Sequence, residues 1–143
     1  MKLPAKIEYA YKAVFELSLR YGKDNPVQLN TISEAQGIPK KFLIQLLLRL
    51  KSANIVDSSR GISGGYNLVR PPSRISLADV FRAIDDSLLL DIRKAKGPKG
   101  SEAGKLILSI WQDIGKQITG RLESITFDQL IAKAKNEQLT YYI

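Results

Sequence analysis

The residues that could do chemistry in this chain are of few kinds, because its 143 residues include no cysteine and no histidine. Disulfides, thiolate metal sites, cysteine nucleophiles and histidine general bases are therefore excluded. The glycine-containing segments 61–66 (GISGGY) and 97–102 (GPKGSE) lack the spacing of dinucleotide-binding and phosphate-binding loops. No convincing pair of carboxylates falls on one predicted face, so we do not expect an enzyme.

Basic side chains are the chemistry that remains, and they are concentrated in the first half of the chain. Of the formal charge of +8, residues 1–75 carry +7, with twelve Lys and Arg against five Asp and Glu. Such a surface attracts polyanions, nucleic acid among them. The alternative is a mildly basic domain that binds no nucleic acid. The charge therefore favours nucleic-acid binding only if the fold displays the basic residues on a surface that can contact it.

The first half of the sequence has the spacing of a helix-turn-helix. Apolar residues recur at helical intervals over residues 4–21, and Thr31 with Glu34 predicts a capping box for a very short second helix that Gly37 ends. Residues 38–54 predict a third helix with Pro39 at its first position. The second helix of such a motif can enter the major groove of DNA. The expected apolar face of this third helix consists of Phe42, Leu43, Leu46, Leu47 and Leu50.

Segment 58–72 (SSRGISGGYNLVRPP) predicts a β-hairpin, because residues 55–59 and 66–69 have strand character on either side of a glycine loop. Tyr66 and Leu68 would share one face of the hairpin. The glycines would let the loop turn tightly and approach a phosphate chain, and Arg60 would supply charge. A helix-turn-helix followed by such a hairpin is a winged helix.

The second half of the sequence predicts three further helices. Ser76 is the expected N-cap of a short helix with Asp79 in its first turn. A loop rich in Lys, Gly and Pro follows over residues 93–105, and the longest helix then runs over residues 101–124. Thr126 and Gln129 predict the cap of a last short helix before the tail. The buried face expected for the first of these helices consists of Leu77, Val80, Phe81 and Ile84.

An apolar stripe close to coiled-coil spacing follows the longest helix and predicts its pairing with a second copy. The dimerisation residues expected on this stripe are Ile107, Ile110, Trp111, Ile114, Ile118 and Leu122.

Together these elements predict a mainly α fold with a small β-hairpin wing. A winged helix DNA-binding domain is expected over residues 1–86, a loop or linker over 87–105, and a dimerisation helix with a C-terminal tail over 106–143. No apolar run approaches the ~20 residues that span a bilayer. The charged start does not have the form of a signal peptide, so a cytoplasmic location is expected.

In its motifs the chain resembles the Rrf2 family of bacterial transcription regulators, which are winged-helix dimers that include iron–sulfur and nitric-oxide sensors. The resemblance rests on the opening YAYKAVFELS, on GIPKKFLIQLLLRLKSANIV, on the wing RGISGGYNLVRPP, on ISLADVFRAID and on LESITFDQL, in that order. It covers nearly the whole chain and implies that the third helix reads bases while the wing holds the backbone or the minor groove.

The DNA-binding residues expected from the motif positions and this resemblance are Thr31, Pro39, Lys40, Lys41, Phe42, Ile44, Gln45, Arg49, Arg60, Gly64, Gly65 and Tyr66. Phe42 stands where relatives commonly have Tyr, and Ile44 where many have Glu. Because each good polar base contact is worth ~1–3 kcal/mol of discrimination, the resemblance implies an operator unlike that of the iron–sulfur members.

Cluster-binding relatives carry three cysteines before the dimer helix, whereas the matching interval 88–105 has none, so no iron–sulfur cluster and no other cofactor is expected. The chain is similar to a cysteine-free branch that includes a repressor of cysteine metabolism, which works with O-acetylserine sulfhydrylase (cysteine synthase). Tyr141, Tyr142 and Ile143 are therefore a candidate docking peptide for that enzyme. The alternative is that the two tyrosines pack on the partner subunit.

The predicted function is a homodimeric, sequence-specific regulator, a repressor, that binds a palindromic operator of double-stranded DNA. The competing interpretation is a protein-interaction module that docks an enzyme such as cysteine synthase through its tail and has little DNA specificity of its own. The apolar Phe42 and Ile44 give that interpretation some support. A small-molecule effector between residues 88–91 and the dimer helix is compatible with either interpretation.

Overall fold

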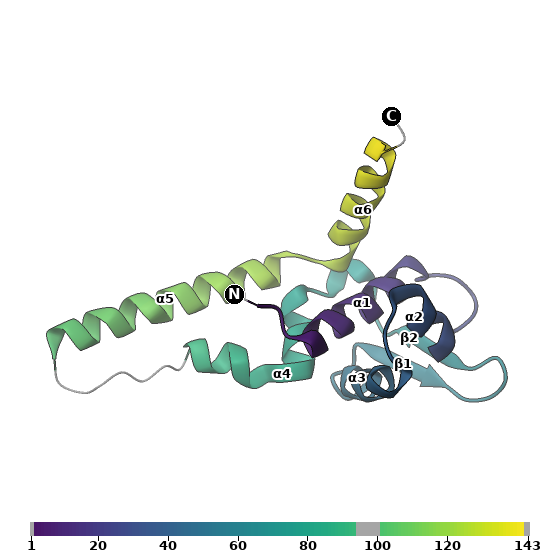
Figure 1. Cartoon of the computed structure of the whole chain (residues 1–143), viewed down its shortest axis with the longest axis horizontal. Coiled ribbons are helices and arrows are strands. Elements are labelled where there is room, and N and C mark those ends of the chain that lie inside the picture. Colours follow the sequence, from purple (N-terminus) through teal and green to yellow (C-terminus); the bar gives the residue numbers. More distant parts are fainter. Residues whose placement is uncertain (1, 94–100, 142–143) are drawn as a thin grey trace.

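The computed structural model describes residues 2–93 and 101–141, and within them the chain forms a winged helix followed by a long projecting helix (Figure 1). The elements are α1 (Ala5–Leu19), α2 (Leu29–Gln36), α3 (Lys40–Ser52), β1 (Val56–Ser59), β2 (Gly65–Leu68), the 3-10 turn η1 (Pro72–Arg74), α4 (Leu77–Arg93), α5 (Glu102–Ser124) and α6 (Phe127–Tyr141). The predicted mainly α fold with a hairpin wing is confirmed.

Aliphatic side chains from every element of the winged domain fill one core. On α1 the residues Ile7, Ala10, Val14 and Leu17 are at most 2% exposed, and their spacing of three and four places them on one side of the helix. The third helix adds Leu43, Leu46, Leu47 and Leu50. Burial of this much aliphatic surface is what holds α1 to α4 together.

Phe42 was expected with those leucines, but it is 58% exposed. At 100° per residue it lies at the edge of the buried stripe of α3, not within it. There its ring stacks on Tyr9 of α1, with centroids 6.5 Å apart. The apolar face expected on α3 therefore divides into four buried leucines and an exposed Phe42, whose contact with DNA stays a prediction.

The hairpin forms as predicted, with Val56 opposite Leu68 in an antiparallel register. Leu68 is buried and Asn67 is exposed, which confirms the expected alternation of faces. A third piece of chain joins the sheet at Val27, whose N–H donates to the Tyr66 carbonyl at 2.9 Å and whose carbonyl accepts from the Tyr66 N–H at 2.8 Å. The segment before α2 is thereby fixed to the wing.

The ends of α2 and α3 differ in part from the prediction. The helix α2 begins two residues before Thr31, so the capping box of Thr31 and Glu34 does not form, and Gln28 is the N-cap. The predicted stop is confirmed, since Gly37 has a φ of 64° and donates its N–H to the carbonyl of Ser33. Pro39 is the N-cap of α3 and not its first helical residue.

Ser76 caps α4 as predicted. Its hydroxyl accepts from the Asp79 N–H at 3.1 Å, and its own N–H donates to the Asp79 carboxylate at 2.9 Å. The helix then bends at Asp85, which has φ −151° and ψ 82°, and continues to Arg93. Since α5 begins at Glu102, helix occupies both ends of the expected linker 87–105, and residues 94–100 lie outside the described residues.

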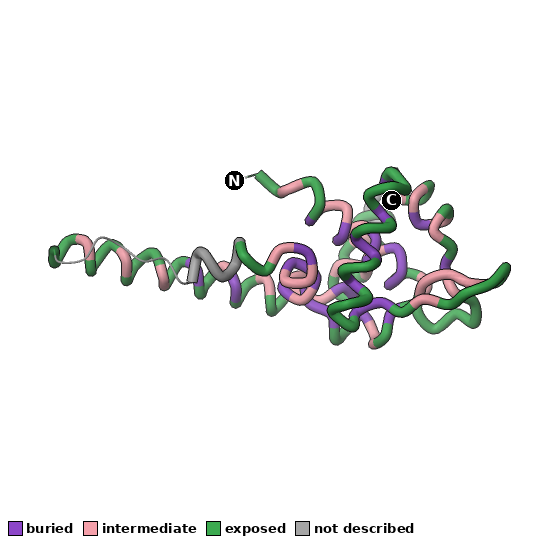
Figure 2. Tube along the Cα trace, turned by 90° about the horizontal axis from the view of Figure 1, so that it is seen from below, coloured by how far each residue is buried: buried purple, intermediate pink, exposed green. Residues whose placement is uncertain are grey.

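The predicted longest helix is confirmed as α5, with the Ser101 hydroxyl accepting from the Gly104 N–H at 3.0 Å as its N-cap. No helix in the described ranges 2–93 and 101–141 is long and apolar enough to cross a membrane. Figure 2 shows α5 extending from the winged domain with mainly exposed residues, while buried residues gather in that domain.

The turn between α5 and α6 is fixed to the start of α4. The N–H of Phe127 donates to the Ile75 carbonyl at 3.1 Å, the N–H of Leu77 donates to the Ile125 carbonyl at 2.9 Å, and the Phe127 ring is fully buried. The predicted partner of Thr126 is confirmed, since its N–H donates to Gln129 Oε1 at 3.3 Å. The helix α6 is longer than expected. It runs to Tyr141 and so includes most of the predicted tail.

Candidate nucleic-acid interface

The outward side of α3 brings four of the predicted DNA-binding residues together. Lys40, Lys41, Ile44 and Gln45 are all exposed, opposite the leucines that face the core. Within the part of the chain that the structure describes, the side-chain polar groups of Lys40, Lys41 and Gln45 make no hydrogen bond or ion pair. Two cations and an amide are therefore available to a ligand outside the protein.

Phe42 lies beside this face and borders a cavity of about 550 Å³ between α1, α3 and α4. Gln45 and Tyr9 line the same cavity, and Lys12 lies over the Tyr9 ring at 6.0 Å. Because the Phe42 ring stacks on Tyr9 of α1, its orientation depends on α1 as well as on α3.

Arg49 has an internal contact in the structure. Its Nη1 donates to the carbonyl of Ile84 at 2.7 Å, immediately before the bend at Asp85. A bend releases helical carbonyls from their usual partners, so Arg49 supplies a replacement donor. Lys6 reaches the Asp85 carboxylate at 2.9 Å. Arg49 thus joins α3 to α4, and its contact with DNA stays a prediction.

The wing presents Arg60 at its exposed start and Ile62, which is fully exposed, at its tip. Gly61 has a φ of 103°, a conformation that favours glycine. A Cβ on Gly64 would lie 2.3 Å from the Ser59 carbonyl oxygen, and one on Gly65 would lie 2.4 Å from the Val27 carbonyl oxygen. Close packing within the wing explains Gly64, and close packing of the wing on the segment at Val27 explains Gly65, without an approach to phosphate.

Tyr66, the remaining predicted wing residue, is half-buried. Its backbone pairs with Val27 and its ring packs against the core. The structure therefore gives Tyr66 a place inside the domain, and its contact with DNA stays a prediction.

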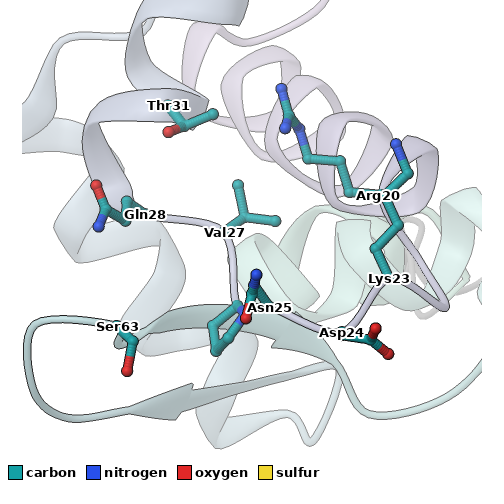
Figure 3. Close-up of a pocket in the computed structure, with 9 residues that line it drawn as sticks. Arg20, Lys23, Asp24, Asn25, Val27, Gln28, Thr31 and Ser63 are labelled. Atoms are coloured by element: carbon teal, nitrogen blue, oxygen red, sulfur yellow. The ribbon is translucent and has the colours of Figure 1, made fainter.

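A cleft of about 550 Å³ separates the end of α1 from the start of α2 and the wing. Figure 3 shows Arg20 and Lys23 on one side of this cleft and Gln28 and Ser63 on the other. Thr31, a predicted DNA-binding residue, also lines it. The Gln28 side-chain amide donates to the Ile62 carbonyl at 3.4 Å, which links α2 to the wing tip.

Arg20 and Lys23 were missed in the sequence because they follow the first helix and lie well before Thr31 in the chain. They approach Thr31 only after α1 packs on α2, where Glu16 contacts Arg20 at 3.5 Å and Gln36 at 3.4 Å. The available signal was the pair of cations in the turn RYGKDN, which adds positive charge beside the motif.

The predicted dimerisation stripe divides into two environments. The four residues nearer the start of α5 are 38–67% exposed, namely Ile107, Ile110, Trp111 and Ile114. The neighbouring Leu106, which is not part of the stripe, is 63% exposed. Ile118 is half-buried, and Leu122 packs against the winged core. Leu122 lies toward the side of α5 where Gly115 and Thr119 are buried, so only the first four form an uncovered surface.

The side chains present do not fit a metal cluster. The whole chain lacks Cys and His, and within the described residues no group of three or more Asp and Glu converges at metal-binding distance. Of the tail residues, Tyr141 ends α6, while Tyr142 and Ile143 lie outside the described residues.

Comparison with known proteins places these features in a family. Residues 3–133 match the Rrf2 family model, described as an iron-dependent transcriptional regulator. The chain is 37% identical to the HTH-type transcriptional regulator IscR of Xenorhabdus nematophila over 97% of its length and 82% of that protein. It is 38% identical to IscR of Photorhabdus laumondii over 92% of its length and 79% of that protein.

Two solved structures share the fold over nearly their whole length. The structure of T. potens IscR has a TM-score of 0.78 at 31% identity, covering 96% of this chain and 91% of that one. The structure of CymR, the global cysteine regulator of B. subtilis, has a TM-score of 0.78 at 26% identity, covering 93% and 98%.

Proposed function

The chain belongs to the Rrf2 family of transcriptional regulators, and we propose that it binds one DNA sequence as a homodimer. The observation that carries this proposal is the exposed face of α3, where Lys40, Lys41 and Gln45 have no partner within the described residues. Lysine and glutamine side chains of that kind donate to guanine and adenine edges in the major groove. The basic charge of residues 1–75 would hold the backbone on either side.

The uncovered stripe on α5 supports the homodimer. Apolar surface gains about 25 cal/mol per Å² when it leaves water, and a second copy of α5 offers the same surface in return. A two-fold axis through paired α5 helices would relate two copies of α3. The operator proposed is accordingly a palindrome, with half-sites one or two helical turns apart.

We propose that the regulated genes belong to cysteine or sulfur metabolism and that the protein represses them. Support comes from the similarity to CymR, the global cysteine regulator of B. subtilis. The lack of cysteine and histidine also favours regulation without an iron–sulfur cluster. Docking of cysteine synthase on Tyr141, Tyr142 and Ile143 stays a proposal that rests on the family resemblance. Such a regulator would act in the cytoplasm.

The interaction-module alternative is not favoured, because the relatives that match over most of this chain are named transcriptional regulators. An apolar Phe42 does not require it either, since Tyr9 supports that ring within the chain.

Selection of bound duplexes from a random DNA pool at two salt concentrations tests the proposal. We expect one palindrome to be enriched and its affinity to fall steeply with salt, because phosphate contacts release counterions. The double variant Lys40→Ala, Lys41→Ala should bind more weakly and with a smaller salt slope. Lys116→Ala, on the exposed surface of α5, is the matched control. A folded, dimeric protein that enriches no sequence would contradict the proposal.

A further inference from the structure

We propose that Ile44 and Leu48 read the 5-methyl groups of thymine in the major groove, so that methyl contact is one source of sequence specificity. The inference rests on the proposed DNA binding and adds to it the identity of the bases under one part of α3. It concerns two aliphatic side chains of α3 that are exposed and lie outside the hydrophobic core.

The two residues form an adjacent pair on the surface of α3. They are one turn apart, at i and i+4, so their side chains are neighbours on the helix. Ile44 is 44% exposed and Leu48 is 60% exposed. The same helix buries four other leucines against the core, so neither side chain of the pair is needed to attach α3 to the domain.

A polar pair with the same spacing lies beside the apolar pair. Lys41 and Gln45 are also at i and i+4, and they too are exposed. The outward side of α3 therefore consists of two parallel rows, one able to donate hydrogen bonds and one unable to form any. Such a surface fits a ligand that carries polar and apolar groups side by side.

The major groove of DNA offers that combination at A·T pairs. Thymine carries a methyl group there, and the paired adenine presents the N7 and N6 groups that a glutamine amide can bind. Beneath Ile44 and Leu48, the exposed O6 of guanine or N4 of cytosine would lose water without gaining a hydrogen bond. The apolar row therefore favours thymine and disfavours G·C pairs.

The charges around the pair indicate DNA as the occupant, in preference to an apolar protein surface. Lys40 and Lys41 precede it, and Lys51 follows it with its ammonium on the Ser58 hydroxyl at 2.6 Å. No acidic residue occurs in α3. A surface ringed by cations attracts a polyanion and repels most cationic surfaces.

The test substitutes deoxyuridine for each thymine of the enriched duplex in turn and measures the dissociation constant by fluorescence anisotropy at fixed salt. Deoxyuridine pairs with adenine as thymine does and lacks only the methyl group. We expect one or two positions in each half-site to lose affinity about fourfold, the factor for one buried methyl group. The remaining positions should be unchanged.

Ile44→Ala and Leu48→Ala identify the side chains responsible. Both residues are exposed and alanine favours helix, so the variants should stay folded. Each variant should bind the thymine and deoxyuridine duplexes equally at its own position. Leu19→Ala, another exposed aliphatic residue outside α3, is the matched control and should keep the ratio.

The outcomes separate this inference from the proposed function. An enriched duplex that tolerates deoxyuridine at every position overturns methyl reading and leaves sequence-specific binding intact. The same holds if Ile44→Ala and Leu48→Ala both keep the full thymine preference. A folded protein that enriches no duplex overturns both proposals.

Discussion

The winged domain and the long helix α5 use the same residue types with opposite results. Ile7, Ile32 and Ile75 are fully buried in the winged domain, whereas Ile107 and Ile110 on α5 are more than half exposed. Ile107 and Ile110 recur at helical spacing, as Ile7 does with the other buried residues of α1, so the sequence alone makes the two apolar faces look equivalent. The difference teaches that spacing identifies an apolar face but does not say whether the same chain covers it.

The two regions also differ in how their backbone is fixed. The bridge between Val27 and Tyr66 and the bond from Arg49 to Ile84 tie elements of the winged domain to one another. Over its first half, α5 has an exposed N-cap at Ser101 and a bare apolar side. The winged domain is thus complete within one chain, while α5 is built to be completed by a second copy in the proposed dimer.

Removal of aliphatic volume should separate the two regions most strongly. Leu50→Ala deletes a fully buried side chain, and we expect the free energy of unfolding to fall by ~2–5 kcal/mol. Ile107→Ala should cost less than about 1 kcal/mol at protein concentrations where monomers prevail, because its side chain is exposed there. Urea titration monitored by circular dichroism measures both. Equal losses would remove the distinction between the regions.

A charge on α5 should break pairing and spare the winged domain. We expect Ile110→Asp to raise the dimer dissociation constant by more than tenfold, because the carboxylate would have to be desolvated between two apolar stripes. DNA affinity should fall with it, while the helical circular dichroism signal is retained. Ser109→Asp places the same charge on an exposed polar position as the control. Sedimentation measures the dimer, and an unchanged dimer would show that the stripe is not the interface.

Loss of an N-cap should cost more in the winged domain than on α5. In Ser76→Ala the bond that the Ser76 hydroxyl accepts from the Asp79 N–H disappears from a buried site, while the backbone N–H of residue 76 can still donate to the Asp79 carboxylate, and a loss of ~1–2 kcal/mol is expected. Ser101→Ala removes one exposed bond to Gly104 and should cost about 0.5 kcal/mol or less. Thermal unfolding of the two variants compares these effects. A larger loss at Ser101 would show that the start of α5 is more constrained than its exposure implies.

The smallest effect concerns Tyr11, which donates its hydroxyl to the Leu77 carbonyl at 3.1 Å. Burial raises the pKa of Tyr11 from 10.0 to about 12. Between these values the unfolded chain loses this proton first, so this contribution to stability is complete below pH 10 and is lost as the pH rises toward 12. Tyr11→Phe should therefore show a shallower loss of stability from pH 10 to 12. Tyr21→Phe, at an exposed tyrosine, should behave as the unchanged protein.

Most of the fold could be predicted because local signals agree with tertiary packing. Gly37 ends α2 through its positive φ, Ser76 caps α4, and the hairpin follows the glycine loop. The capping box of Thr31 and Glu34 failed because the Val27–Tyr66 bridge fixes the chain just before α2 and the helix starts earlier. Local sequence does not contain that long-range contact.

The candidate site was predicted where one helix presents it and missed where several elements meet. Lys41 and Gln45 follow from the phase of α3 alone. The internal contact of Arg49 depends on the bend at Asp85, and the position of Lys23 beside Thr31 depends on the packing of α1 on α2. These contacts form only when the chain folds, so the spacing of residues along the chain could not predict them.

The separation of the exposed stripe on α5 from the reading face of α3 has a genetic consequence for the proposed dimer. A copy with a damaged α3 would still pair with an intact copy and leave it with half a DNA-reading surface. Such an allele would be dominant over the intact gene. An allele that unfolds the winged domain, or one that disrupts the stripe, would leave intact copies to pair with each other and would be recessive. The position of a change in this chain thus predicts its inheritance in a cell that carries both alleles.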